Sequence, residues 1–213
     1  YVQGVTAGAA YVRLVTADDQ QLGLRFREET AQEVSVLPAQ TCRRHEWRLS
    51  GLLAGRRYGY EVVDAQGAVR GAGSFRTAPV TDAAPVKFAV VGDSGKVPWW
   101  VWLQRSPLFH LPAAWDWLPT ASDVTRIGAE IAAQEPDFLL HVGDIIYPNG
   151  MQGHYSAGFF RPFAPVLGHS AAFMTLGNHD VMEDAGRQAL ANFRGPDSDF
   201  ADDGRNYTVV WGS

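Results

Sequence analysis

The chain has 213 residues, of which 46% are hydrophobic and 19% charged, with a formal net charge of −5. This composition is that of an ordinary globular protein of one or two domains, and the acidic balance argues against a stable nucleic-acid partner, because phosphate backbones attract basic surfaces. No apolar run is long enough to cross a membrane, so we expect no transmembrane segment. Cys42 is the one cysteine, and it leaves the redox compartment open.

Residues 1–78 have the pattern of short strands. Apolar residues such as Leu22, Leu24 and Phe26 alternate with others, which places one face of a strand in a core and the other in water. Glycines separate these runs, so the segment predicts a small all-β sandwich. Residues 52–60 (LLAGRRYGY) and 74–79 (SFRTAP) resemble the Leu-Gly-Tyr corner and the last strand of fibronectin type III domains.

The pattern changes after a linker at residues 79–85. Residues 86–91 are a nearly continuous apolar run, which predicts a strand buried on both faces. Apolar residues then follow helical spacing between 124 and 132, and residues 137–142 and 171–176 predict two further strands. Strand, helix and strand in alternation indicate an α/β domain over residues 86–213.

Each of the three predicted strands of this second domain ends in a short polar motif. Because open α/β sheets bind ligands at the carboxyl ends of their strands, we expect the three motifs to meet at one edge of the sheet. The motifs are Gly92-Asp93-Ser94-Gly95, Gly143-Asp144-Ile145-Ile146-Tyr147 and Gly177-Asn178-His179-Asp180.

The residue types in these motifs suit a pair of metal ions. Asp93 and Asp144 offer hard carboxylate oxygens, and one carboxylate can bridge two ions about 3.5 to 4 Å apart. The amide oxygen of Asn178 is a neutral ligand for a divalent ion, whereas the phenol of Tyr147 favours a ferric ion over zinc.

The last motif also supplies the candidate catalytic residues. His179 would face the site as a proton donor or transition-state partner. Asp180 would orient the imidazole of His179 through its other ring nitrogen. We therefore predict that His179 and Asp180 are catalytic.

GDSG, GDIIY and GNHD, in this order, resemble the first three signature motifs of metallophosphoesterases, and the tyrosine narrows the resemblance to purple acid phosphatases. Plant-type members also have a fibronectin-like domain before a four-layer α/β/β/α catalytic domain. The resemblance implies that Asp93 and Tyr147 bind Fe(III) and that Asp144 bridges to a divalent ion (iron, zinc or manganese). It implies that Asn178 binds this second ion and that Asn178 and His179 contact the substrate phosphate. A metal-bound hydroxide would attack phosphorus in line.

The chain departs from the family pattern in two ways. The family has two later motifs that supply three further ligands, histidines among them, and neither motif occurs in these 213 residues. We therefore expect a C-terminal half of the catalytic domain as a partner, opened by a strand at residues 207–213, and little activity from this chain alone. Residues 98–119 are rich in tryptophan and are interpreted as an insertion. It is open whether they pack over the second domain, stack a leaving group as a lid, or form a partner patch.

The remaining histidines are weaker candidates. His141 lies inside a predicted strand and is expected to be packed or to support a ligand. We expect His45 to face solvent. His110, His154 and His169 lie in loop-like sequence and are possible substrate contacts.

The function predicted from these observations is hydrolysis of phosphate monoesters at a dinuclear metal centre. A phosphodiesterase or nucleotide hydrolase is a close alternative, because the three motifs are common to both. A non-catalytic binding protein with a degenerate metallophosphoesterase domain is the alternative from another class. The expected partner is a phosphate ester, and the resemblance implies a secreted, periplasmic or cell-surface location.

Overall fold

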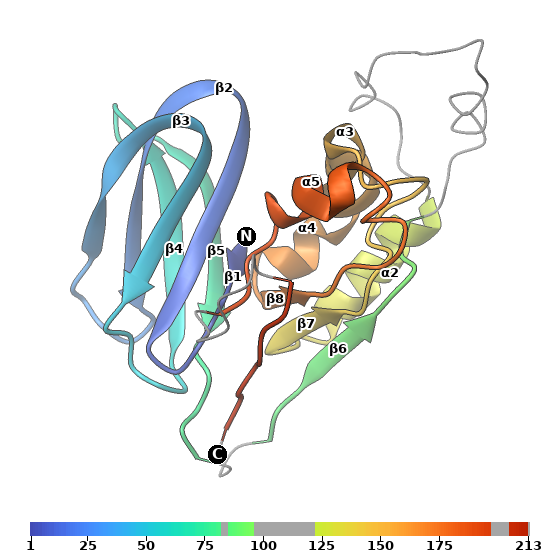
Figure 1. Cartoon of the computed structure of the whole chain (residues 1–213). Helices are drawn as coiled ribbons and strands as arrows, with labels where there is room; N and C mark the ends of the chain where they lie inside the picture. Colours follow the sequence, from blue (N-terminus) through green and yellow to red (C-terminus); the bar gives the residue numbers. More distant parts are fainter. Residues whose placement is uncertain (82–84, 96–121, 197–204, 213) are drawn as a thin grey trace.

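The computed structural model describes residues 1–81, 85–95, 122–196 and 205–212. Their strands form one mixed sheet in the order β5-β4-β2-β1-β8-β7-β6, with β3 paired to β2 (Figure 1). The strands are β1 (Val2–Gln3), β2 (Ala9–Glu28), β3 (Ser35–Ser50), β4 (Arg57–Asp64), β5 (Val69–Arg76), β6 (Phe88–Val91), β7 (Phe138–His141) and β8 (Ala171–Met174). The helices are α2 (Ser122–Ala133), α3 (Gln152–Tyr155), η1 (Ser156–Phe160), α4 (Arg161–Leu167), η2 (Asp184–Gly186) and α5 (Arg187–Leu190).

The N-terminal part is all-β and antiparallel, built around two long strands that bend. A register shift between Val15 and Gln20 divides β2, so its first half pairs with β1 and the end of β3. Its second half pairs with the start of β3 and with β4. Side chains from different strands, Leu24, Trp47 and Phe75 among them, share one buried core. The strands are thus joined continuously through β2 and β3, and the assignment to the fibronectin type III family stays a prediction.

One side chain of this part contradicts the sequence analysis. His45 is only 1% exposed, and its ring stacks on Trp47 with the centroids 5.3 Å apart. Burial lowers the pKa of His45. The prediction that His45 faces solvent is therefore wrong, because the strand alternation places it on the core side of β3.

A two-residue strand joins the N-terminal part to the second part of the chain. β1 runs parallel to β8, with Val2 opposite Ala171, and it also pairs with β2. An ion pair between Arg76 and Asp137, at 3.1 Å, crosses the same junction. No pattern in the sequence predicted that the first residues extend the sheet of the second part. The predicted domain boundary at residues 79–85 stays a prediction.

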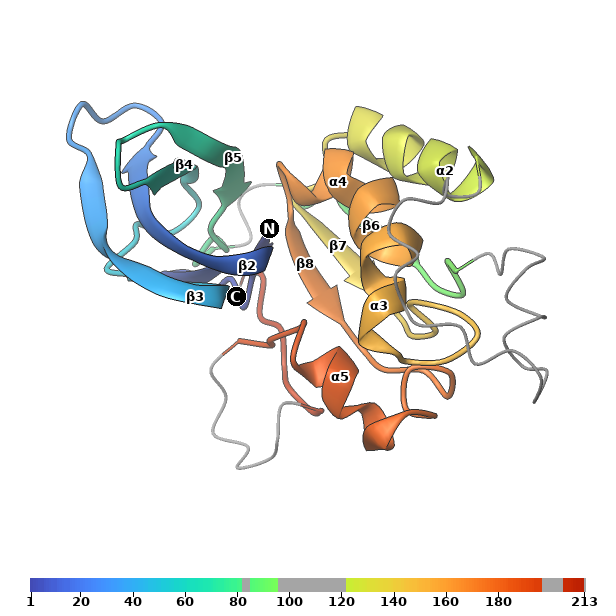
Figure 2. The ribbon, with the colours of Figure 1, turned by 90° about the horizontal axis from the view of Figure 1, so that it is seen from above.

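The second part has the predicted α/β order. β6, β7 and β8 are parallel neighbours, and α2 and α4 lie together on one side of them (Figure 2). The helices pack closely, since a side-chain carbon at Gly128 of α2 would collide with the backbone oxygen of Pro162 in α4. Leu139 of β7, Ala172 of β8 and Phe163 of α4 share a second buried core. These parallel strands direct their carboxyl ends, and the motifs that follow, towards the same edge.

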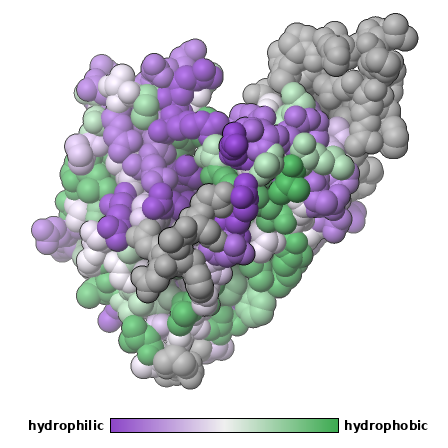
Figure 3. All heavy atoms as spheres, in the orientation of Figure 1, coloured by the Kyte–Doolittle hydropathy of each residue, from purple (hydrophilic) through white to green (hydrophobic). Residues whose placement is uncertain are grey.

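The other face of this sheet is only partly covered. Residues 205–212 run along it without forming a strand, and Trp211 packs against Phe138 with ring centroids 4.8 Å apart. Phe88 and Val90 of β6 remain 54% and 55% exposed. Figure 3 shows hydrophobic surface in the region where Figure 1 draws β6. The prediction of a strand buried on both faces is wrong for β6 in the described structure, because nothing described covers its second face.

No helix in the described ranges is long and apolar enough to cross a membrane. The tryptophan-rich segment 98–119 and His110 lie outside the described residues.

Candidate metal centre

The three polar motifs meet at the carboxyl edge of β6, β7 and β8, as predicted. Close approach of their backbones requires glycine at two positions. A side-chain carbon at Gly177 would collide with the backbone nitrogen and Oδ1 of Asp144. A side-chain carbon at Gly95 would lie 2.7 Å from Cδ2 of Tyr147. Larger residues at either glycine would therefore force the motifs apart.

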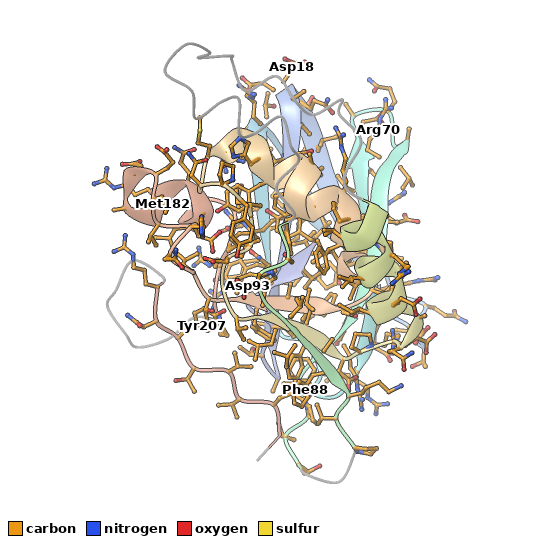
Figure 4. The ribbon with its side chains drawn as sticks, turned by 90° about the vertical axis from the view of Figure 1, so that its right-hand side faces the viewer. Asp18, Arg70, Phe88, Asp93, Met182 and Tyr207 are labelled. Carbon is orange, nitrogen blue, oxygen red and sulfur yellow. The ribbon has the colours of Figure 1, made fainter. Side chains whose placement is uncertain are left out.

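Three oxygen-bearing side chains converge at this edge. The hydroxyl oxygen of Tyr147 lies 2.7 Å from Oδ1 of Asp93 and 3.0 Å from Oδ2 of Asp144, so its single hydrogen is shared between the two carboxylates. Figure 4 shows Asp93 at the far end of β6 from Phe88, at the edge where the motifs gather. Burial and the two carboxylates raise the pKa of Tyr147, so the phenol is protonated in the metal-free protein. The structure thus brings together three of the four predicted metal ligands.

The backbone at both aspartates is in the left-handed region that residues other than glycine rarely adopt. The φ angles are 48° at Asp93 and 50° at Asp144. Such conformations cost on the order of 1–3 kcal/mol each and cluster at functional sites. Here they turn the chain sharply after two parallel strands.

The fourth predicted ligand is less firmly placed. Asn178 is exposed, and its side chain makes no hydrogen bond with any other part of the chain that the structure describes. Within those same residues, no three His, Cys, Asp or Glu side chains gather where they could hold a metal ion. The donors present are carboxylate, phenol and amide oxygens, which fit a hard cation. The arrangement therefore fits one metal position better than a second.

His179 adjoins the oxygen cluster. Its backbone N–H donates to Oδ1 of Asp144 at 3.0 Å, and its ring lies 4.4 Å from that of Tyr147. Nδ1 is 2.7 Å from the carbonyl oxygen of Pro148, an acceptor, so Nδ1 carries the proton. This leaves Nε2 for exchange of a proton with a ligand.

Asp180 does not have the predicted contact with the His179 ring. Its carboxylate is fully buried and accepts hydrogen bonds from the backbone N–H groups of Ile145 and Gly177, at 3.1 and 2.9 Å. Burial raises the pKa of Asp180, and these hydrogen bonds oppose that shift. Asp180 therefore links the second motif to the third. The carbonyl of Pro148, and not Asp180 as predicted, orients the imidazole of His179.

Two residues that are not predicted metal ligands, His141 and Ser94, lie beneath the cluster. His141 is fully buried, with Nε2 2.9 Å from Oγ of Ser94. Burial lowers the pKa of His141 to about 4. The sequence predicts that His141 is packed or supports a ligand, and it indicates no role for Ser94. One feature of the sequence could have indicated this pair. His141 is a polar residue inside an apolar strand, and Ser94 directly follows the candidate ligand Asp93 at the end of the neighbouring strand.

The other described histidines lie elsewhere. His154 is nearly buried in α3, with Nδ1 3.4 Å from the carbonyl oxygen of Asn149. His169 contacts Ser74 of β5 at 3.3 Å, at the junction with the N-terminal part. The substrate contacts considered for both stay predictions.

Residues 86–212, which include all three motifs, match the family profile Metallophos, described as calcineurin-like phosphoesterase. The chain belongs to the calcineurin-like phosphoesterase family. Metallophosphoesterases hydrolyse phosphoesters in a metal-dependent reaction and use dinuclear metal centres. The match covers every candidate ligand, so the convergence of Asp93, Asp144 and Tyr147 lies within the family domain.

Solved structures share the fold of this calcineurin-like phosphoesterase. Purple acid phosphatase PPD1 from yellow lupin (Lupinus luteus) superposes with a TM-score of 0.64 at 16% identity, covering 92% of this chain and 40% of the lupin chain. The structure of PhoD gives a TM-score of 0.55 at 12% identity, covering 86% of this chain and 39% of that one. This chain therefore spans about two fifths of either protein. No curated protein sequence matches it.

Proposed function

We propose that the protein is a phosphatase of the purple acid phosphatase type, which hydrolyses phosphate monoesters at a dinuclear metal centre. The observation that carries the proposal is the contact of the Tyr147 phenol with both Asp93 and Asp144 at the carboxyl edge of the sheet. The family supports phosphoester hydrolysis as the reaction class. The tyrosine supports the purple acid phosphatase branch within it.

The proposed roles follow from the positions of the side chains. Asp93, Tyr147 and Asp144 would hold an Fe(III) ion, and Asp144 with Asn178 would hold a divalent ion such as iron, zinc or manganese. When bound, such ions offset the charge of the phosphoryl oxygens and activate water as the nucleophile. His179, oriented by its Nδ1 hydrogen bond to a backbone carbonyl, would bind the phosphate with Asn178 and transfer a proton through Nε2.

The ferric assignment depends on Tyr147. Because its pKa is raised in the metal-free protein, the phenol must release its proton to become a ligand, and metal binding should release a proton with it. We expect the oxidised, metal-loaded protein to show a visible phenolate-to-iron absorption band, which Tyr147→Phe removes. A native oxidised protein with metal and without this band would contradict the ferric assignment.

Substrate class is tested with matched aryl phosphates. We expect the native protein to cleave p-nitrophenyl phosphate in preference to bis(p-nitrophenyl) phosphate, and Asp144→Asn to lose both activities. A preference for the diester would favour the phosphodiesterase alternative. Activity that survives in Asp144→Asn would place the reaction elsewhere.

The second metal needs ligands that the described residues do not provide. We propose that a C-terminal half of the catalytic domain supplies them and covers the open face of β6, where Phe88, Val90 and Val142 are exposed. The test is phosphatase activity and metal content of this chain with and without that half, at saturating iron and zinc. Equal activity in both samples would contradict the proposal.

We also propose, from the resemblance to purple acid phosphatases, that the protein acts outside the cytoplasm, as a secreted, periplasmic or cell-surface enzyme. Fractionation of the native cells with an antibody against the chain tests this location. Recovery in the cytoplasmic fraction alone would contradict it.

A further inference from the structure

A buried hydrogen-bond chain joins the loop after β6 to the loop after β7. The backbone N–H of Gly143 lies 3.3 Å from Nδ1 of His141. Nε2 of His141 is 2.9 Å from Oγ of Ser94, and that oxygen is 3.2 Å from the carbonyl of Ile145. His141 is fully buried and Ser94 is 6% exposed, so water has little access to these groups.

The partners determine which atom donates at each step. A backbone N–H only donates, so Nδ1 of His141 accepts from Gly143 and Nε2 carries the ring hydrogen. Nε2 therefore donates to Oγ of Ser94, whose hydroxyl donates in turn to the carbonyl of Ile145. The lowered pKa of His141, about 4, keeps the ring neutral at physiological pH, as this pattern requires.

The chain gives the Asp93 loop a second attachment point. The backbone N–H of Asp93 already donates to the carbonyl of Gly143 at 3.1 Å. One hydrogen bond leaves a loop free to pivot about it, whereas a second one at the neighbouring Ser94 fixes its orientation. The rings of Phe159 and Phe163 meet His141 edge to face, with centroids 5.7 and 6.4 Å away, and hold the imidazole in place.

We propose that His141 and Ser94 are positioning residues that set the separation of Asp93 and Asp144, and so the affinity of the site for its first metal ion. This inference rests on the proposed metal centre and extends it to two residues that are not among its proposed ligands. Asp93 and Asp144 flank the chain on either side and both have strained backbones, so losing the chain lets the two carboxylates drift apart.

The inference predicts an unusual order among amide substitutions. His141→Gln places an amide N–H near the position of Nε2 and keeps the link to Ser94. His141→Asn is one methylene shorter, reaches only the position of Nδ1 and loses that link. We therefore expect metal affinity to stay close to wild type in His141→Gln, and to fall roughly tenfold in His141→Asn and in Ser94→Ala, as for other groups that orient metal ligands.

Ser170→Ala is a matched control for Ser94→Ala. Ser170 is 3% exposed and its hydroxyl also donates to a backbone carbonyl, that of Pro136 at 2.6 Å, but it lies at the opposite end of β8 from the site. Both substitutions should lower the thermal stability of the metal-free protein by similar amounts. Only Ser94→Ala should weaken metal binding.

The experiment measures metal affinity of the native protein and its variants by chelator competition, with elemental analysis and thermal unfolding alongside. In a Ser94→Ala background, His141→Gln and His141→Asn should bind metal equally, because the link that separates them is gone. Unchanged affinity in Ser94→Ala, or an equal loss in Ser170→Ala, would overturn the inference and leave the metal centre standing. Absence of metal binding in the wild-type protein would overturn both. If the His141 variants fail to fold, Ser94→Ala and its control decide.

Discussion

The ends of β7 and β8 carry two predicted metal ligands in very different surroundings. Asp144, after β7, is 9% exposed, and its two oxygens accept hydrogen bonds from the His179 backbone and the Tyr147 hydroxyl. Asn178, after β8, is exposed and makes no side-chain hydrogen bond within the described ranges. The fold of these residues therefore preorganises one metal position and leaves the other dependent on further groups.

The positions of the strands in the sheet explain this difference. β7 lies between β6 and β8, so loops approach its carboxyl end from both sides. β8 has β7 on one side, but β1 on the other pairs only with Ala171 and Ala172 at its start. In the described ranges, no strand pairs with β8 on the β1 side beyond Ala172, so no strand end stands beside the loop of Asn178 there.

The largest effect should come from Asp144→Asn. A proposed bridging ligand serves both ions, so we expect the occupancy of both metal positions to fall. Phosphatase activity should drop by more than about 100-fold, which exceeds the loss typical of residues that only orient a metal ligand. Asp137→Asn, at the other end of β7, is the control and should keep its metal. Elemental analysis that finds both metals at full occupancy in Asp144→Asn would remove the bridging role.

The buried histidine beneath the β7 end should make stability depend on pH. The pKa of His141 is lowered from 6.5 to about 4, so the unfolded chain takes up the proton first as pH falls. The stabilising contribution is complete above pH 6.5 and is lost between pH 6.5 and 4, by about 3 kcal/mol. Denaturant unfolding of the metal-free protein at several pH values measures it, and His141→Gln should lose this part of the pH dependence. If the free energy of unfolding varied with pH in the same way in the wild-type protein and in His141→Gln, His141 would not be a buried neutral imidazole.

Asp180→Asn tests the link between the loop after β7 and the loop after β8. The carboxylate accepts hydrogen bonds from backbone N–H groups of both loops. The amide of asparagine would point an N–H donor at one of these N–H groups, so we expect the free energy of unfolding to fall by about 1–3 kcal/mol. Asp184→Asn, an exposed aspartate paired with Arg187, should change stability by less than about 0.5 kcal/mol. Equal stabilities of the two variants in denaturant unfolding would show that Asp180 does not hold the loops together.

The smallest effect is expected at the open β8 end. Asn178→Ala should weaken the binding of the second metal ion roughly tenfold. It should leave the free energy of unfolding unchanged, because the side chain is exposed and makes no hydrogen bond within the described residues. Metal titration that resolves the two sites measures this difference. If Asn178→Ala lost the first metal ion, the end of β8 and not the end of β7 would be the preorganised metal position.

The sequence by itself predicted the order of strands and helices and the positions of the motifs at the strand ends, because these depend on residues that are close together in the chain. The alternation of strands and helices after residue 85 and the meeting of the three motifs at one sheet edge are both confirmed. Parallel strands place their carboxyl ends together whatever their other contacts, and glycines permit the turns that follow. That geometry predicted that the motifs of Asp93, Asp144 and Tyr147 lie at one edge, and the resemblance to purple acid phosphatases implied that these three residues share one metal ion.

Only the tertiary structure decided which partner each polar group has. Asp180 is next to His179 in sequence, yet its carboxylate turns to the backbone of Ile145, and the carbonyl of Pro148 orients the imidazole instead. Likewise, β1 pairs with β8 although Val2 and its partner Ala171 are far apart in the sequence, and β6 exposes Phe88 where its apolar sequence predicted burial. Hydrogen-bond partners and burial depend on which segments are adjacent in space. Periodicity along the chain indicates which face of a strand is apolar, but it does not indicate which segment covers that face.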